Sequence, residues 1–424
     1  MTAKEAIDYI HSMVWDRSAT GYEHAENLLK KMGNPERQLK YVHIGGTNGK
    51  GSTAAMVASV LRKAGYKTGL YTSPFIYRFQ ERMQINGEQI KDEELAEITQ
   101  YVKGLVKEME IGPSEFALVC CIAFEYFKRN RCDIVVLEVG MGGEKDSTNV
   151  IPCPEVAVMT NIGLDHTEFL GETLKEIALT KAGIFKEHGL AVTYEAEPEV
   201  QQVFEKVCAQ RQIELHRAKF DDLSIKECSL EGQIFTYQGR ENLCLPLLGK
   251  HQTKNAAVAI TTIDALRQRG WNITEEALRE GLQSVTWPGR FERVGTSPDF
   301  IIDGGHNPQC IDALAENIDI YLANRRIVAL TGVLEDKEYE NMYQPMLAKT
   351  DVFVCIEPPS PRKLDAKILA TFFEREGAKA IPCKTIEDGV KTAIKEAGED
   401  GVILCYGSLY SIGEIKEVHQ KNLH

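Results

Sequence analysis

Tyr41-Val-His-Ile-Gly-Gly-Thr-Asn-Gly-Lys-Gly-Ser-Thr53 is the stretch of the chain that decides the fold. An apolar run over residues 39–44 leads into it, and a helix-like run over residues 52–63 leaves it. Glycines let backbone N–H groups turn toward an anion, and the start of a helix adds further N–H groups and a positive dipole end. Lys50 supplies a cation for the outer phosphates, and Ser52 or Thr53 supplies a hydroxyl for Mg²⁺. We therefore predict a nucleotide triphosphate loop.

This loop departs from the strict Walker pattern in two places. Ile44 stands where that pattern has its first glycine, and Gly51 separates Lys50 from the following hydroxyl. A glycine-rich turn between a strand and a helix can also serve tight packing alone. On this segment by itself, both interpretations stay open.

Composition limits the classes of protein that remain. A chain of 424 residues is too long for one ordinary core, so we expect two or three domains. No apolar run approaches the roughly 20 residues of a membrane span, and the first residues carry no export signal. Eleven cysteines without a C-x-x-C pair fit reduced thiols, and a net charge of −13 argues against nucleic acid. We expect a cytoplasmic protein that binds neither nucleic acid nor a membrane.

Two regions of alternating strand and helix patterns predict an α/β protein with two doubly wound domains. The run 132–139 is apolar on both faces, as in the central strand of a parallel sheet. Beyond the junction 287–293, strand and helix patterns alternate again up to the strand 402–406. The expected domains are a larger N-terminal ATPase-like domain, 1–294, and a smaller Rossmann-like domain, 295–424.

Polar residues follow the predicted strands of the first domain, where an open α/β sheet gathers its ligand groups. Ser73 follows the strand 67–71, and Glu138 lies near the end of the run 132–139. A hydroxyl and a carboxylate suit Mg²⁺, although Glu138 could instead form a salt bridge. His166 follows the strand 156–160 and could ligate a second metal or begin the next helix.

Several basic and amide residues have less decisive patterns. Arg78 and Arg82 are four residues apart and would share one side of a helical turn, or would form ordinary surface pairs. Lys181 has the pattern of a surface lysine on a helix that starts near Gly171. Asn255 lies one helical turn after His251, so both could face one ligand, although a polar first turn is also ordinary capping.

The second predicted sheet carries its own polar cluster. Asp303-Gly-Gly-His306 follows the strand 300–302, and Ser408 follows the last strand. Asp303 could hold a ribose or orient phosphates, and His306 could contact an anionic substrate. If the two polar edges face each other, they form the interdomain cleft in which enzymes commonly join two substrates.

The motifs together resemble those of the folylpolyglutamate synthases, including the related dihydrofolate synthases, within the Mur ligase superfamily. The resemblance spans nearly the whole chain and rests on Gly46-Thr-Asn-Gly-Lys-Gly-Ser52, Thr72-Ser-Pro74, Glu138-Val-Gly-Met-Gly-Gly143, Asn161-Ile-Gly-Leu-Asp-His166, Lys181-Ala-Gly-Ile184, Asn255-Ala-Ala257, Gly289-Arg-Phe-Glu292 and Asp303-Gly-Gly-His-Asn-Pro308. The family's usual Asp-Gly-Ala-His is Asp303-Gly-Gly-His306 here. Phe75 stands where many bifunctional members have histidine, which favours a synthase that acts only on reduced folates.

The resemblance implies roles for individual residues. It implies that two Mg²⁺ ions, with K⁺ as a further candidate cation, accompany ATP, and that CO₂ carbamylates Lys181, which reverses the surface interpretation of this lysine. The catalytic residues would be Lys50, Lys181 and His306. The implied ATP contacts are Thr47, Asn48, Gly49, Lys50, Gly51, Ser52, Asn255, Arg290 and Asp303. The implied metal ligands are Ser73, Glu138 and His166, and the implied substrate contacts are Phe75, Arg82, His306 and Ser408.

The implied activity is an ATP-dependent ligase that acts as a monomer. It would add L-glutamate to the terminal carboxylate of a reduced folate through an acyl phosphate. One alternative is an enzyme that is also a dihydrofolate synthase. An alternative of another class is a regulatory module that binds ATP without chemistry, although such a module does not need the set Lys50, Glu138, His166 and Lys181.

Overall fold

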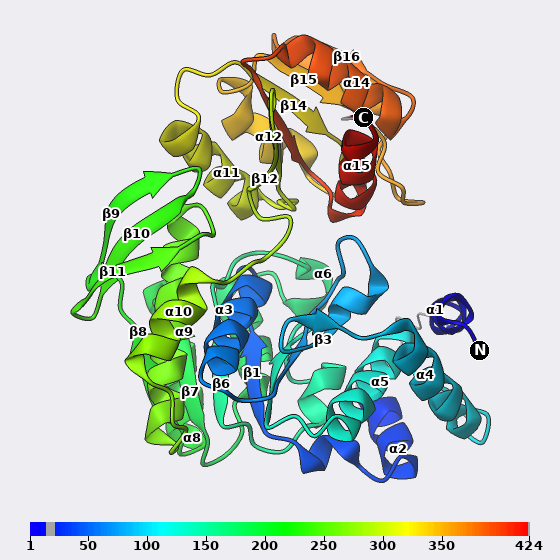
Figure 1. The fold of residues 1–424 in the computed structure, drawn as a ribbon, viewed down its shortest axis with the longest axis vertical. Helices are drawn as coiled ribbons and strands as arrows, with labels where there is room; N and C mark the ends of the chain where they lie inside the picture. The colour runs from blue at the N-terminus through cyan, green and yellow to red at the C-terminus, as the bar shows by residue number, and fades with distance from the viewer. Residues whose placement is uncertain (14–21, 423–424) are drawn as a thin grey trace. The chain divides into compact units, whose positions relative to one another are not determined.

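The computed structural model of the chain describes residues 1–13 and 22–422 (Figure 1). It divides into two compact units. The first unit contains Met1–Ser224, Thr236–Cys244 and Thr253–Val285, and the second contains Ile225–Phe235, Leu245–Gln252 and Thr286–His424. The predicted boundary between residues 294 and 295 stays a prediction.

The first unit is built on an eight-stranded sheet in the order β4-β3-β2-β5-β1-β6-β7-β8. Six of these strands run parallel, and the two edge strands β3 and β4 pair antiparallel. The strands are β1 Tyr41–Gly45, β2 Thr68–Tyr71, β3 Met83–Ile85, β4 Glu88–Gln89, β5 Ile134–Glu138, β6 Val156–Met159, β7 Leu190–Tyr194 and β8 Glu214–Ala218. Every residue of β1 and β5 is buried, which confirms the prediction of a central parallel strand at 132–139.

Helices of the first unit bury their apolar sides against this sheet. One hydrophobic cluster joins α2, α4 and α5 to β2 and β5, and another joins α7 and α8 to β6 and β7. The helices are α1 Ala3–His11, α2 Glu23–Lys31, α3 Lys50–Lys63, α4 Asp92–Val106, α5 Glu115–Arg129, α6 Thr167–Leu170, α7 Leu174–Lys181, α8 Pro198–Gln210, α9 Lys250–Gln268 and α10 Glu275–Gln283. The helix expected from Gly171 onward begins at Leu174, where Thr173 and Glu176 form a capping box.

A separate three-stranded sheet has the order β11-β10-β9. Its strands are β9 Leu223–Ser229, β10 Gly232–Tyr237 and β11 Arg240–Leu245. The sequence predicts a single hairpin in this region. The structure has a third strand because the alternating pattern continues past the turn Gln238-Gly239, where both residues adopt a positive φ.

The second unit has a six-stranded sheet in the order β12-β13-β17-β14-β15-β16. Its strands are β12 Glu292–Thr296, β13 Asp299–Ile302, β14 Ile327–Thr331, β15 Val352–Cys355, β16 Ala380–Pro382 and β17 Val402–Tyr406, and only β12 is antiparallel. Its helices are α11 Pro308–Tyr321, α12 Tyr339–Leu347, α13 Ala366–Arg375, α14 Ile386–Ala397 and α15 Leu409–Asn422.

Helices cover both faces of this second sheet. Ala329 belongs to the hydrophobic cluster formed with α11, α12 and α13. The next residue, Leu330, points to the opposite face and lies beside Gly389 of α14. The structure therefore confirms an α/β fold with two wound sheets. No helix in the described parts of the chain has the length and apolar character needed to cross a membrane.

Candidate active site

The phosphate loop connects the end of β1 to the start of α3, and two of its glycines have no possible substitute. Gly46 has φ 141° and Gly49 has φ 84°, a region that side chains rarely adopt. A Cβ on Gly46 would collide with the Thr160 hydroxyl, and a Cβ on Gly49 would collide with the Asn255 side chain. The loop thus depends on β6 and α9 as well as on its own sequence.

The end of β6 holds this loop in place. Thr160 Oγ1 lies 3.1 Å from the Gly45 carbonyl oxygen and 2.8 Å from the Asn48 carbonyl oxygen. The Thr47 amide donates to the Asn161 carbonyl at 2.7 Å. These contacts hold the Gly45 and Asn48 carbonyls and the Thr47 amide in place, so the backbone of the loop is fixed by the end of β6.

Two lysines approach the loop from different elements. Lys50 Nζ donates to the Thr47 carbonyl at 3.0 Å, and Lys181 Nζ donates to the Gly46 carbonyl at 3.0 Å. Lys181 is only 4% exposed, so the surface position predicted from its pattern is wrong. Lys181 is the last residue of α7, so the end of this helix lies beside the phosphate loop.

The environment of Lys181 disfavours its charged form. Burial, together with the positive charge of Lys50, lowers the pKa of Lys181 to about 7. Asp165 and Asp146 oppose this shift but do not cancel it. Near neutral pH, a substantial fraction of this lysine is therefore a neutral amine, which is a nucleophile.

Glu138 and Ser73 meet at the ends of the neighbouring parallel strands β5 and β2. The Ser73 amide donates to Glu138 Oε2 at 3.0 Å, and Glu138 is 5% exposed. Ile44, one residue before the loop, pairs with Glu138 across β1 and β5. This carboxylate and the Ser73 hydroxyl are hard oxygen donors, which Mg²⁺ prefers.

The described residues contain no group of three or more His, Cys, Asp or Glu side chains that could form a complete metal cage. Mg²⁺ is commonly bound by one or two carboxylates together with water and substrate phosphates. The donor set Ser73 and Glu138 beside a phosphate loop fits such a shared site. His166 caps α6 without a side-chain cap bond, is half exposed, and has Nε2 4.0 Å from Asp165 Oδ2.

The other predicted contacts of the first unit lie on these same elements. Gly51 and Ser52 form the first turn of α3, and Ser52 is buried. Asn255 is buried on α9 beside Gly49. The structure therefore brings the predicted loop residues and Asn255 together.

The two arginines after Ser73 have different environments, so the idea that they share one side of a helical turn is wrong. A short 3₁₀ helix, Phe79–Arg82, starts after Arg78. Arg78 is exposed and pairs with Asp92 at 3.6 Å. Arg82 is 9% exposed, and its guanidinium carbon lies 5.3 Å from the ring centres of both Phe75 and Phe79. Arg82 and Phe75 thus lie together.

In the second unit, the loops after β13 and β17 form one polar edge. The Gly407 amide donates to the Gly305 carbonyl at 2.9 Å and ties the two loops together. His306 and Asn307 lie in the first loop, where Asn307 caps α11. Ser408 lies in the second loop, is 3% exposed, and accepts the Tyr410 amide at 3.3 Å.

The polar side chains of this edge form hydrogen bonds with backbone groups. Asp303 accepts the Phe291 amide at 2.8 Å and the Gly305 amide at 2.6 Å. His306 Nδ1 lies 2.9 Å from the Gly304 carbonyl oxygen, which can only accept, so Nδ1 carries a proton. Arg290 Nη1 donates to the Gly289 carbonyl at 3.2 Å. Asp303, Arg290 and His306 therefore shape one loop cluster.

Comparison with known proteins agrees with this arrangement. The model of the Mur ligase middle domain matches residues 44–263, and that of the Mur ligase glutamate ligase domain matches residues 289–409. The chain is 35% identical over 430 residues to the dihydrofolate synthase/folylpolyglutamate synthase of Bacillus subtilis, with 98% of each chain covered. The chain belongs to the folylpolyglutamate synthase family of Mur ligases.

Further relatives extend this result. The folylpolyglutamate synthase of Lacticaseibacillus casei is 34% identical over 434 residues, with 98% of each chain covered. A solved complex described as FPGS-AMPPCP-folate superposes with a TM-score of 0.86 at 33% identity, covering 100% of each chain. As a member of this family, the chain is an ATP-dependent ligase that forms carbon–nitrogen bonds.

One buried hydrogen-bond network was not predicted from the sequence. It lies beside the motif Glu138-Val-Gly-Met-Gly-Gly143. Asp146 accepts the amides of Met141 and Thr148, both at 2.9 Å, and also the Thr148 hydroxyl. His43 Nε2 lies 2.9 Å from that hydroxyl oxygen, and burial lowers the pKa of His43 to about 3. An Asp two residues before a Thr is the signature of an Asx turn and could have revealed this network.

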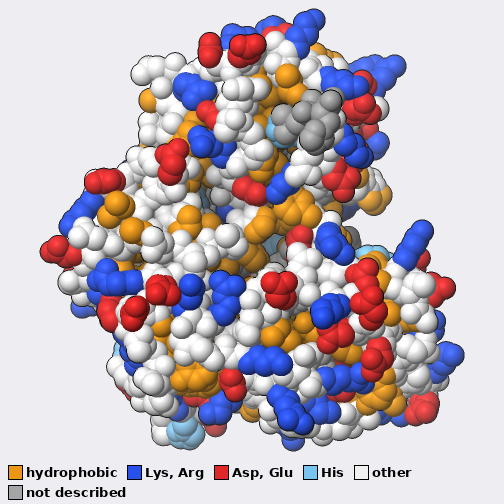
Figure 2. All heavy atoms as spheres, in the orientation of Figure 1, with side chains coloured by type: hydrophobic (Ala, Val, Ile, Leu, Met, Phe, Trp, Pro, Cys, Tyr) orange, Lys and Arg blue, Asp and Glu red, His pale blue; other side chains and the backbone are white. Residues whose placement is uncertain are grey.

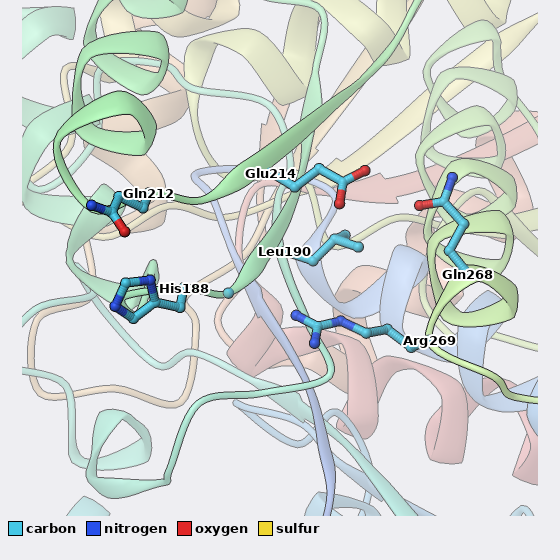
Figure 3. Close-up of a pocket in the computed structure, with 7 residues that line it drawn as sticks. His188, Leu190, Gln212, Glu214, Gln268 and Arg269 are labelled. Atoms are coloured by element: carbon cyan, nitrogen blue, oxygen red, sulfur yellow. The ribbon is translucent and has the colours of Figure 1, made fainter.

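A hollow of about 330 Å³ lies away from this chemistry (Figure 3). Its lining includes His188, Glu214 and Arg269. Leu190 and Glu214 are the first residues of β7 and β8, whereas the phosphate loop follows the last residue of β1. In a parallel sheet these are opposite edges, so the hollow is not part of the candidate active site.

Proposed function

We propose that this ligase adds L-glutamate to the terminal carboxylate of a reduced folate, with ATP cleaved to ADP and phosphate. The observation that carries the proposal is the convergence of Lys50, Lys181, Ser73 and Glu138 at neighbouring strand ends around a phosphate loop. The names of both relatives and the folate and AMPPCP complex support the choice of substrates.

The reaction we propose has two steps. The folate carboxylate attacks the γ-phosphate of ATP, which forms an acyl phosphate and releases ADP. Lys50 then leaves the Thr47 carbonyl and donates to the migrating phosphoryl oxygens, where positive charge stabilises the transition state. The amine of glutamate attacks the acyl carbon and expels phosphate, so one amide bond forms as the acyl–phosphate bond breaks.

The metal requirement is part of this proposal. Ser73 and Glu138 would hold one Mg²⁺ and His166 would help to hold a second, with K⁺ as a further cation. When bound, Mg²⁺ would neutralise phosphate charge and align the γ-phosphate. The position of Glu138 supports the first site, because this buried carboxylate accepts the Ser73 amide at the strand end beside the phosphate loop.

We also propose that Lys181 reacts with CO₂. The neutral Nζ lone pair would attack the carbon of CO₂ and lose a proton, which leaves a carbamate anion on the side chain. Support comes from the burial of Lys181 and from its pKa near 7, which makes the amine available. The resulting negative charge would suit a site that gathers Mg²⁺ ions.

The polar edge of the second unit would serve both substrates. We assign Asp303 and Arg290 to ATP, together with Asn255 of the first unit, and His306 and Ser408 to glutamate. The hydrogen bonds that fix the Asp303 and His306 loop support a preorganised binding site. We further propose a cytoplasmic monomer. The eleven free cysteine thiols support the location, because a reducing compartment keeps thiols reduced.

An ADP-release panel tests the proposed function. ADP should form rapidly only when a reduced folate and L-glutamate are both present. ADP formed equally well without glutamate would contradict the mechanism, and no turnover with any substrate would favour a regulatory ATP-binding module. Turnover with dihydropteroate as well would indicate the second activity that the name of the Bacillus subtilis relative includes.

A further inference from the structure

The loop between Ser73 and Arg82 carries three of the proposed site residues, and one carboxylate organises its backbone. The Ile76 amide donates to Glu81 Oε2 at 2.8 Å, and the Arg78 amide donates to Glu81 Oε1 at 3.0 Å. Between them, the Tyr77 amide lies 3.1 Å and 3.2 Å from the two oxygens. Three successive backbone amides therefore converge on Glu81.

Convergent amides of this kind form a nest, a concave site that binds an anion. Hydrogen bonds to a charged acceptor are stronger than neutral ones, so Glu81 fixes the backbone of this loop firmly. The base of the loop is also closed, because the Thr72 amide donates to the Arg82 carbonyl at 3.1 Å. Gln84 Nε2 donates to the Glu81 carbonyl at 3.1 Å and holds the same end.

The side chains of this loop depend on that backbone. Arg82 directly follows Glu81, and its guanidinium carbon lies 5.3 Å from the ring centres of both Phe75 and Phe79. The Ser73 amide is held by Glu138 at the other end of the loop. The position of Phe75 relative to Arg82 is thus set by a stretch of backbone that Glu81 holds.

We infer that Glu81 is a positioning residue for the folate side of the reaction: its carboxylate shapes the loop that presents Phe75 and Arg82. This inference rests on the proposed function. The phosphate loop is held by different groups, Thr160 and Asn161. Loss of the Glu81 carboxylate should therefore raise KM for the folate and leave KM for ATP nearly unchanged.

Steady-state ADP release tests this with Glu81→Gln, which keeps the size of the side chain but places an NH₂ donor against amide donors. We expect KM for the reduced folate to rise about tenfold, as for lost hydrogen bonds to a charged group. KM for ATP should stay within about twofold and Tm within about 3 °C. Asp92→Asn is the control for the side-chain contacts of this loop, because Asp92 pairs with the Arg78 guanidinium and accepts the Gln80 side chain but accepts none of the three loop amides.

Chemical rescue separates positioning from a general loss of packing. In Glu81→Ala, formate or acetate should bind the vacated amides and lower KM for folate again, whereas chloride at equal ionic strength should not. An unchanged KM for folate in Glu81→Gln would overturn the inference. A large fall in Tm with both KM values raised, or the same effect in Asp92→Asn, would overturn it too.

The wild-type enzyme separates this inference from the proposed function. If it releases ADP only with folate and glutamate and Glu81→Gln leaves KM for folate unchanged, only the role of Glu81 is refuted. If it shows no folate-dependent ADP release, the proposed function and this inference both fail. Should Glu81→Ala not fold, the result with Glu81→Gln decides.

Discussion

The polar edges of the two sheets use their charges differently. In the first unit, Lys50 and Lys181 each donate to a carbonyl of the phosphate loop, at 3.0 Å in both cases. In the second unit, the Asp303 carboxylate accepts two backbone amides and thereby fixes its own loop. The first edge offers two long lysine side chains whose present carbonyl partners can be replaced by a ligand. The second edge offers a backbone that hydrogen bonds already hold in place.

This difference suggests a division of labour. A lysine that leaves a carbonyl for a phosphate, as we propose for Lys50, can follow charge as it moves, which suits phosphoryl transfer. A loop fixed by Asp303 and joined to the neighbouring strand loop suits the recognition of a small substrate with few adjustments. Acidic and basic side chains are interspersed over the face shown in Figure 2. The whole chain has a net charge of −13, so the pair of lysines beside the phosphate loop is a local feature.

The largest expected effect comes from the first edge. Lys50→Ala should lower kcat about 10³-fold, because one preorganised donor to the transferring phosphoryl group is lost. Its Tm should stay close to that of the wild type, since the Lys50 side chain donates one hydrogen bond to a single loop carbonyl, that of Thr47. ADP release measures the rate, and Lys63→Ala, an exposed lysine at the far end of α3, is the control. Unchanged turnover in Lys50→Ala would contradict the proposed role of the first sheet's polar edge in phosphoryl transfer.

Lys181→Ala should lower kcat about 10²-fold, with the loss arising from the missing carbamate charge. Short carboxylic acids should restore part of this activity by supplying an anion at the same place. The measurement is ADP release with and without acetate, at fixed ionic strength. An equally slow variant that acetate never improves would refute the carbamate while leaving a structural role for the lysine.

The second edge should respond in KM rather than in kcat. His306→Ala should raise KM for glutamate about tenfold, as expected for one lost hydrogen bond to a charged group, with kcat changed less. Ser408→Ala should have a smaller effect in the same direction. Initial rates against glutamate concentration give both constants. If His306→Ala lowers kcat as strongly as Lys50→Ala, the two edges do not differ as described.

The smallest effect concerns stability and pH. The pKa of Lys181 falls from 10.5 to about 7 on burial in the folded protein. Between these values, the unfolded chain holds a proton that the folded chain lacks, so this group makes the free energy of unfolding rise with pH. Lys181→Met removes this dependence, and its stability advantage over the wild type should shrink from pH 7 to pH 10 in CO₂-free buffer. A constant difference would show that Lys181 is charged when buried.

The parts of the fold that long apolar patterns determine could be predicted from the sequence. The buried run at 132–139 forms a central strand because only a parallel sheet covers both of its faces. The helical patterns over residues 198–210 and 339–347 predict two helices, and the structure has helices Pro198–Gln210 and Tyr339–Leu347 there. The strand Val402–Tyr406 also has the predicted bounds. The short strands β12 and β16 at the edges of the second sheet were missed, because three to five residues carry too little periodicity.

The candidate site was predictable only where a local pattern carries the chemistry. Glycines 46 and 49 stand out, because a positive φ demands them. The local pattern around Lys181 could not predict its burial, since its contact is with the Gly46 carbonyl, 135 residues away in the chain, and only the family resemblance pointed away from the surface. The amide nest around Glu81 was hidden for a related reason: each of its donors is a backbone N–H, which every residue type except proline possesses.

The central claim is that the folate carboxylate attacks ATP before glutamate reacts. Folate labelled with ¹⁸O in its terminal carboxylate tests it most directly, by mass analysis of the released phosphate. We predict that one labelled oxygen is transferred to phosphate in each turnover that forms the amide. Released phosphate without label, while glutamate is still incorporated, would contradict the acyl phosphate and with it the proposed role of the first edge.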